Sequence, residues 1–319
     1  MGPARLFSAL ALAIAAAPAC AQPFPPLKAI VAPVQVTPRV WYVQGDPGVA
    51  SAANEAFNSN AGFVVTDEGV VVIDALGSPA LGHRLLAAIR SVTPKPVRRV
   101  IVTHYHADHF YGLKPLKDAG AEVWAHRGSL DYLDNGEAER RRAQRARDLR
   151  PWVTDETPLV RADRWLEGDE AFTLGGIRFE VQHFGPAHSP EDLVVVLPGE
   201  GVVFSGDILF TGRVPFVGQA DSKAWLARIG RLIDLAPRYM VTGHGAVSRD
   251  PGADLALTRD YLTFLRAEMG RAVADFVPFE EAYRRTDWRR FAGLPAFEAA
   301  NRVNAYGTYL LMEKESLGK

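Results

Sequence analysis

The sequence predicts an α/β fold: a four-layer αββα sandwich in which two β-sheets pack face to face, helices cover both outer faces and further helices follow at the C-terminus. Short β-branched runs recur in each half of the chain, and each series ends in a helical segment, as expected for sheets covered by helices. After residue 250, apolar residues recur at four-residue spacing, which is typical of a helix. Composition alone does not distinguish this sandwich from other α/β folds.

The elements can be assigned in chain order from these patterns. In the first half, strands are expected at 39–44, 61–66, 70–74 and 98–103, with a helix over 79–91. In the second half, strands are expected at 122–125, 172–183, 193–197, 202–205 and 238–242, and a helix at 221–235. The last helices are expected over 257–269 and 297–312.

One further segment, 139–147, carries five arginines among good helix formers. Its simplest interpretation is the solvated face of a helix within 136–150. The alternative is a lid or docking surface beside a functional site.

Composition limits the classes of partner. The 319 residues are 48% hydrophobic and 23% charged, enough to bury a large core, and the formal net charge is −1. A nearly neutral chain has no long-range field to gather nucleic acid or an anionic membrane. We therefore expect a small-molecule substrate and no nucleic-acid partner.

The N-terminus has the pattern of an export signal. Arg5 precedes an apolar run over 6–17, and small residues flank a cleavage position after Ala21. The run is too short to span a membrane in the mature protein, which is expected to be periplasmic or secreted. Lipidation at Cys20 is the minor alternative. The expected organisation is a signal peptide 1–21, an extended proline-rich leader 22–38, a catalytic domain 39–250 and a C-terminal helical extension 251–319 packed on that domain.

Cysteine usage restricts the possible metal ligands. Cys20 is the only cysteine, and cleavage after Ala21 removes it. The mature protein would then have no disulfide and no thiolate ligand, so any metal must be held by nitrogen and oxygen atoms.

The strongest chemical signal is the string His104-Tyr-His106-Ala-Asp108-His109, directly after the apolar run 100–102. Side chains two apart on an extended chain point the same way, so His104 and His106 can share one metal. Asp108 and His109 fall where the chain enters a helix expected over 110–116, which can direct them to a second metal. Four potential ligands in six residues make a polar turn with incidental histidines a poor explanation.

This string resembles the signature of the metallo-β-lactamase superfamily, and the resemblance implies a metallo-β-lactamase sandwich with three later ligands. Residues that match these ligands follow apolar runs and stand among small residues: His188, Asp207 and His244. By this resemblance one zinc is held by His104, His106 and His188, the second by Asp108, His109 and His244, and Asp207 bridges them. Asp74 matches the family's first acidic motif and is expected to orient the metal-binding loops through hydrogen bonds.

The resemblance implies a secreted hydrolase with two Zn²⁺ per chain, whose metal-bound hydroxide attacks an ester, thioester, lactone or amide carbonyl. Asp108 is the expected catalytic residue, assisting proton transfer. The charge that two divalent ions leave at the site can stabilise an oxyanion.

Several alternatives remain within the superfamily. Asp207 stands where many β-lactamases carry a thiolate, which favours other hydrolases, yet residues 187–195 resemble the corresponding β-lactamase strand. Export and the segment 301–306 resemble periplasmic zinc hydrolases associated with quinoprotein and sulfur-oxidation systems. A persulfide dioxygenase with a single iron and a non-catalytic metal-binding accessory protein are the other candidates.

Four further side chains carry weaker signals. His83, His126 and His183 lie outside the motifs and are expected to be structural. Arg213, shortly after Asp207, is expected to be a surface residue, with contact to an anionic substrate group as the alternative.

Overall fold

The computed structural model of the chain describes residues 24–218 and 220–318. The predicted signal peptide 1–21, including Cys20, lies outside the described residues. None of the helices within them combines the length and apolar character needed to cross a lipid bilayer.

Seven strands form the first sheet, and their order in the sheet is their order in the chain. They are β1 (Pro33–Gln35), β2 (Val40–Val43), β3 (Ala61–Val65), β4 (Val70–Ile73), β5 (Val97–Ile101), β6 (Glu122–His126) and β7 (Arg164–Leu166). Pairing is antiparallel from β1 to β4 and parallel from β4 to β7. Because β4 and β5 are parallel, Asp74 and the loop 102–106 leave the sheet at the same edge.

Five strands form the second sheet, in the order β12-β11-β10-β9-β8. They are β8 (Glu170–Leu174), β9 (Ile177–His183), β10 (Leu193–Leu197), β11 (Val202–Phe210) and β12 (Tyr239–His244). Only the β11–β12 pair is parallel among these neighbours. The predicted ligand His188 follows β9, Asp207 lies within β11 and His244 ends β12.

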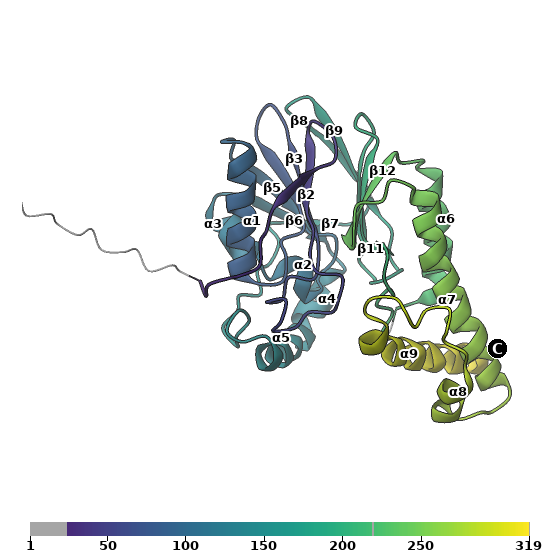
Figure 1. Cartoon of the computed structure of the whole chain (residues 1–319). Helices are drawn as coiled ribbons and strands as arrows, with labels where there is room; N and C mark the ends of the chain where they lie inside the picture. Colours follow the sequence, from purple (N-terminus) through teal and green to yellow (C-terminus); the bar gives the residue numbers. More distant parts are fainter. Residues whose placement is uncertain (1–23, 219, 319) are drawn as a thin grey trace, which may run out of the picture.

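The alternating side chains of β4 show how the layers are built. Val70 and Val72 belong to a core shared with the outer helix α1 (Pro79–Val92), whereas Val71 and Ile73 belong to the core between the two sheets. A third core lies between the second sheet and its helices. The predicted four-layer sandwich is confirmed (Figure 1).

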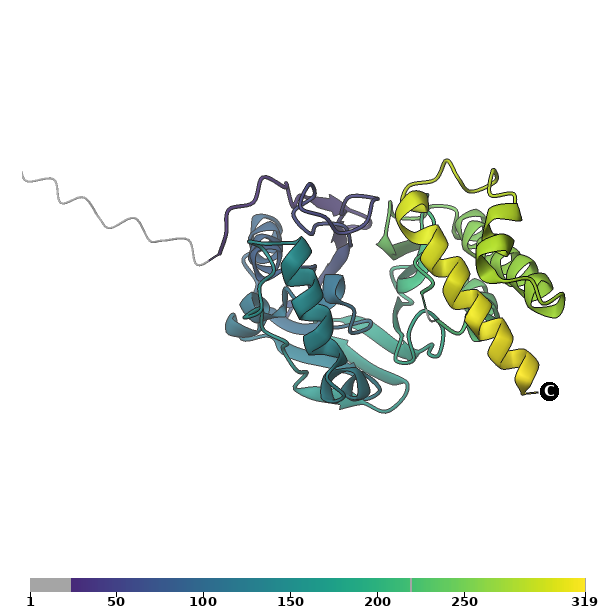
Figure 2. The same ribbon diagram turned by 90° about the horizontal axis from the view of Figure 1, so that it is seen from below.

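The outer helices divide between the two halves. Those of the first half are α1, α2 (Ala107–Phe110), α3 (Leu113–Asp118), α4 (Ser129–Asp134) and α5 (Glu137–Asp148). Those of the second half are α6 (Ser222–Asp234), α7 (Pro251–Ala274), α8 (Phe279–Arg285) and α9 (Phe297–Leu317). Figure 2, seen from below, shows the C-terminal helices beside the second half, on the other side of the molecule from α5. Helix α7 packs against α6, α9 and β11, so the C-terminal helices share the core of the second half.

Two predicted elements are each divided by glycines. The strand predicted over 172–183 is the hairpin β8–β9, because Gly175 and Gly176 adopt positive φ angles of 49° and 80° and reverse the chain. The helix predicted over 110–116 is broken between α2 and α3 near Gly112. A Cβ atom on Gly112 would lie 1.9 Å from the Ala75 carbonyl oxygen, so the two backbones approach closely only because a glycine is present.

The leader is more ordered than its composition predicts. Its residues Pro33–Gln35 form β1 on the edge of the first sheet, paired with β2. The backbone N–H groups of Lys28 and Ala29 both donate to the Glu55 carboxylate at 2.8 Å. Proline-rich segments lack periodicity even where tertiary contacts order them, which explains why the sequence pattern did not reveal this strand.

Candidate metal centre

The loop between β5 and α2 supplies four of the seven predicted ligands. His104 and His106 precede α2 on extended backbone, and Asp108 and His109 lie in its first turn. This change from strand to helix within six residues directs the four side chains to one centre. His104 and His109 are fully buried, whereas Asp108 retains slight exposure.

The other three ligands approach from the second sheet. Asp207 lies where the register between β11 and β12 shifts, beside Gly206, whose φ is 50°. A Cβ atom on Gly243 would lie 1.9 Å from Asp207 Oδ1, so only glycine leaves room for this carboxylate. The structure brings all seven predicted ligands together.

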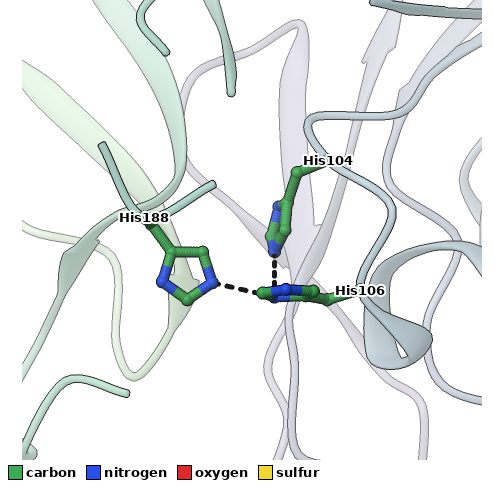
Figure 3. Close-up of side chains that lie close together, drawn as sticks. All are labelled: His104, His106 and His188. Carbon is green, nitrogen blue, oxygen red and sulfur yellow. Dashed lines mark hydrogen bonds between the residues drawn. The ribbon is translucent and has the colours of Figure 1, made fainter. Parts of the chain in front are cut away.

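Three imidazoles form the first cluster, which Figure 3 shows in close-up. His106 Nδ1 lies 3.1 Å from His104 Nε2 and 2.9 Å from His188 Nε2. Tetrahedral bonds of about 2.0–2.1 Å to zinc would place nitrogen ligands roughly 3.3 Å apart, so the three ring nitrogens suit one cation. They come from both halves of the molecule.

Asp108, His109 and His244 form the second cluster, with donor atoms within 4.8 Å of one another. His244 Nε2 lies 3.4 Å from Asp108 Oδ2. Asp207 stands between the clusters: its oxygens lie 3.4 Å from Nε2 of His109, His188 and His244. This is the arrangement a carboxylate needs in order to bridge two cations.

Two buried atoms of this centre lack a hydrogen-bond partner. His109 Nε2 and Asp207 Oδ1 are inaccessible to solvent and lie 3.4 Å from each other, but neither makes a hydrogen bond among the described residues. Buried polar atoms are rarely left in this state, because the missing bond costs about 1–3 kcal/mol each. Nitrogen and carboxylate donors without a partner fit a bound divalent cation.

The ring nitrogens that face away from the centre are held by hydrogen bonds. His109 Nδ1 lies 2.9 Å from Asp74 Oδ2, His188 Nδ1 lies 3.0 Å from the Phe216 carbonyl oxygen, and His244 Nδ1 lies 2.7 Å from the Asn58 carbonyl oxygen. An N–H donated to each acceptor leaves the Nε2 lone pair directed at the centre.

Asp74 holds more than one ligand. Its Oδ1 accepts the backbone N–H of Thr103 at 2.8 Å, which positions the start of the ligand loop. The residue has a φ of 62°, a conformation that aspartate tolerates better than most side chains. The hydrogen bonds expected of Asp74 from the sequence are therefore present, to the loop and to His109.

The protonation states of the centre are set by burial and by neighbouring charges. Burial is the main cause that lowers the pKa of His104, and of His106 to about 3, so both rings are neutral. Burial opposes ionisation of Asp207, but His244 and His109 outweigh it and hold its pKa well below the usual range. Burial lowers the pKa of His109, but Asp207 and Asp74 outweigh it and raise this pKa well above the usual range. His109 therefore carries a proton that a bound cation would displace.

Arg213 does not have the predicted position. It is only 2% exposed, and its Nη1 donates to the Gly48 carbonyl oxygen at 2.9 Å. The same nitrogen lies 3.3 Å from His244 Nδ1, on the side of the ring away from the other ligands. The prediction of a surface arginine is wrong, because the loop after β11 folds inward over His244.

The three remaining histidines lie outside the ligand clusters. His126 and His183 stack with ring centroids 3.9 Å apart, where the ends of β6 and β9 meet. His83 on α1 lies against the Phe24 ring. None of the three belongs to a metal-ligand group within the described part of the chain.

Sequence reasoning missed the acceptors and donors around the ligands. Asn58 Nδ2 donates to Asp108 Oδ2 at 2.9 Å, and its carbonyl oxygen holds His244. Phe216 acts through its backbone carbonyl, so its side chain gives no signal. The run of asparagine and serine at 58–60, just before β3, is the only hint that the sequence offers.

Comparisons with known proteins agree with this geometry. Residues 54–244 match the metallo-beta-lactamase superfamily. The chain is 26% identical over 193 residues to the metallo-beta-lactamase type 2 of Elizabethkingia meningoseptica, covering 59% of this chain and 69% of that enzyme.

Solved structures extend the likeness of fold to the C-terminal helices. The sec-alkylsulfatase Pisa1 of Pseudomonas sp. superposes with a TM-score of 0.68 at 20% identity over 88% of this chain, and this chain covers 50% of that one. A metallo-beta-lactamase family protein of Thermus thermophilus gives a TM-score of 0.62 at 19% identity, covering 89% of this chain and 95% of that one. The chain thus spans half the length of the alkylsulfatase.

Proposed function

The chain belongs to the metallo-β-lactamase superfamily and has a metallohydrolase fold, and from this premise we propose that it is a zinc-dependent hydrolase of carbonyl-type substrates: esters, thioesters, lactones or amides. The observation that carries the proposal is the convergence of seven donor side chains on one buried centre, where His109 Nε2 and Asp207 Oδ1 make no hydrogen bond. Nitrogen and carboxylate donors without sulfur suit Zn²⁺.

The residues divide by role. His104, His106 and His188 would hold one ion, Asp108, His109 and His244 the other, and Asp207 both. When bound, two zinc ions supply a hydroxide near neutral pH and polarise the carbonyl oxygen of the substrate. Two divalent ions, less two carboxylates and one hydroxide, leave the centre about one unit positive, which favours a developing oxyanion.

Asp108 is the ligand best placed to move a proton. Its side chain is 15% exposed, whereas that of Asp207 is 5% exposed. Asn58 Nδ2 donates to Oδ2 and fixes the carboxylate plane, which leaves Oδ1 to face an incoming group. Burial opposes ionisation of Asp108, but His109 and His244 outweigh it and lower its pKa, so the carboxylate is ionised.

Metal analysis and a substrate panel test this proposal. We expect two zinc ions per chain in protein purified without added metal, and hydrolysis of at least one carbonyl class among β-lactams, thioesters and lactones. Hydrolysis of phosphodiesters or alkyl sulfates alone would contradict the carbonyl substrate class. Asp108→Ala should lower the rate by at least about 100-fold, a loss at the low end of that for general acid–base catalysis. Asp118→Ala on the exposed face of α3 is the matched control and should keep the wild-type rate.

The outcomes separate the alternatives. A single bound iron without zinc would contradict the hydrolase proposal and favour the persulfide dioxygenase. Bound zinc without hydrolysis of any panel member would favour the accessory protein. Preference for β-lactams would identify the β-lactamase, which is supported by the similarity of residues 187–195 and by the relative from Elizabethkingia meningoseptica.

Export from the cytoplasm belongs to the same proposal. It rests on Arg5, the apolar run 6–17 and the small residues before Gln22. N-terminal sequencing of protein from the periplasm should begin at Gln22. A blocked Cys20 carrying lipid would establish the alternative, a membrane-anchored form.

A further inference from the structure

The arginines of α5 are not equivalent. Arg140 and Arg147 face solvent, as expected for a charged helix. Arg142 Nη1 donates to the Thr157 carbonyl oxygen at 3.2 Å. Arg145 instead points inward: its Nε is buried and has no hydrogen-bond partner among the described residues. Arg145 is therefore only partly exposed, and its Nε is turned away from solvent.

Arg145 lines a cavity beside the metal centre. The cavity lies between α5, α2 and the loop 50–56, and it is also lined by Tyr111 and by the ligand Asp108. Its empty space, counting the mouth, is about 190 Å³, and the enclosed part holds roughly one water molecule. In Figure 1, α5 lies below α2 and α4, at the lower end of the first half of the molecule.

Tyr111 adds a second unpaired donor to this cavity. The residue is completely buried, yet its hydroxyl group has no hydrogen-bond partner in the described chain. A tyrosine hydroxyl is protonated near neutral pH and can donate a hydrogen bond. Two residues that line this small space, Tyr111 and Arg145, thus each have a buried donor atom without a hydrogen-bond partner among the described residues.

A simple counter-charge role for Arg145 does not explain this arrangement. A guanidinium that neutralised Asp108 directly would lie within ion-pair distance of it. Among the described residues, however, Arg145 has no ion pair within 4.0 Å, and Asp108 receives its hydrogen bond from Asn58 instead. The charge of Arg145 contributes to the low pKa of Asp108, but no carboxylate of the described residues pairs with it directly, and it lines the cavity.

We propose that this cavity is an anion subsite, in which Arg145 and the Tyr111 hydroxyl bind a carboxylate substituent of the substrate beside the Asp108 edge of the metal centre. The inference rests on the proposed hydrolase function. The planar guanidinium offers only donors and the phenol hydroxyl can donate one hydrogen bond, which match carboxylate oxygens. Bound cations neutralise Asp108, so its charge does not repel the substituent.

A matched pair of esters tests the subsite: mono-p-nitrophenyl succinate, and p-nitrophenyl butyrate, in which a methyl group replaces the carboxylate. Arg145→Gln should lower kcat/KM for the succinate ester by about 10- to 100-fold and change it less than about 2-fold for the butyrate ester. Tyr111→Phe should lower the succinate rate by about 3- to 10-fold. Arg147→Gln, on the exposed face of the same helix, is the control and should change neither rate.

Direct binding separates failure of the subsite from failure of the proposed function. If neither ester is hydrolysed, the proposed ester hydrolysis is rejected. The subsite is then tested separately, by titration of the zinc-loaded protein with succinate. Arg145→Gln should weaken that binding by at least about 10-fold relative to Arg147→Gln. Equal succinate affinity in these variants, or equal loss of both ester rates with loss of zinc, would overturn the inference.

Discussion

The two halves of the molecule deliver their metal ligands in different ways. The first half contributes four ligands from one loop, over the six residues 104–109, backed by Asp74 at the end of the adjacent strand. The second half contributes three ligands from three separate segments. Its two histidines are held by backbone carbonyls, those of Phe216 and Asn58. One half of the centre is therefore nearly local in sequence, whereas the other depends on distant contacts.

The ligand positions in the second half also depend on contacts with the C-terminal helix α9. Asn304 Oδ1 accepts the backbone N–H of Val217 at 2.8 Å, and its Nδ2 donates to the Pro215 carbonyl oxygen at 2.8 Å. These bonds enclose Phe216, whose carbonyl oxygen orients His188. A residue more than 100 positions after the ligand thus acts as a positioning residue for it.

Removal of one ligand from each half should give the largest effect. His106→Ala and His188→Ala each break the first cluster, so we expect zinc affinity to fall by more than about 100-fold in both variants, beyond the loss typical of residues that only orient a ligand. The melting temperature should fall by roughly 10 °C, because bound metal no longer stabilises the fold. Equal melting temperatures for wild type and variants, with and without chelator, would contradict this.

Removal of the Asp74 carboxylate, which orients ligands in the first half, should cause the next largest loss of zinc affinity. Asp74→Asn keeps the size of the side chain but removes the negative acceptor for His109 Nδ1 and Thr103. We expect zinc affinity to fall by about 10- to 100-fold, as measured by competition with a chromophoric chelator. Asp67→Asn, at an exposed carboxylate, is the control and should bind zinc as the wild type does.

Removal of the Asn304 hydrogen bonds from α9 should lower zinc affinity less than Asp74→Asn does. Asn304→Ala should lower zinc affinity by about 10-fold, since the asparagine acts on His188 only through the loop. Asn301→Ala is the matched control on the same helix, because Asn301 shares the contact with the Tyr261 hydroxyl but makes no bond to the 215–218 loop. Both variants should lose about 1–3 kcal/mol of unfolding free energy. Equal zinc affinity in the two variants would show that α9 contributes stability alone.

The smallest expected effect is on the pH dependence of stability, and it arises where His126 of the first half contacts His183 of the second half. Burial, with a contribution from His183, lowers the pKa of His126 to about 4, so the folded state resists its protonation. As the pH falls from about 6.5 towards 4, the unfolded chain takes up the proton first and stability declines. The partial exposure of the ring limits this to on the order of 1 kcal/mol. The unfolding free energy, measured with urea, should decline less over this pH range for His126→Gln than for wild type.

The fold was predictable where apolar patterns are regular. The fully buried run 193–197 is β10 with the bounds that the pattern predicted, and α1 and α6 agree within a residue or two because their caps are local. The pattern failed at β1, and at the glycine turn that divides β8 from β9. Glycine turns and edge strands depend on conformation and pairing partners more than on periodicity.

The sequence by itself determined the identity of the donor residues. They are the four ligands within 104–109 and the motif residues His188, Asp207 and His244. The sequence reveals them because a metal binds only certain side-chain atoms, which mark a few residue types. Only the tertiary structure decided which acceptors orient those donors and which arginines turn inward. Backbone carbonyls at Asn58 and Phe216 are present at every residue of any sequence, so no residue type marks them. Arg145 and Arg213 look like surface residues until the folded chain encloses them.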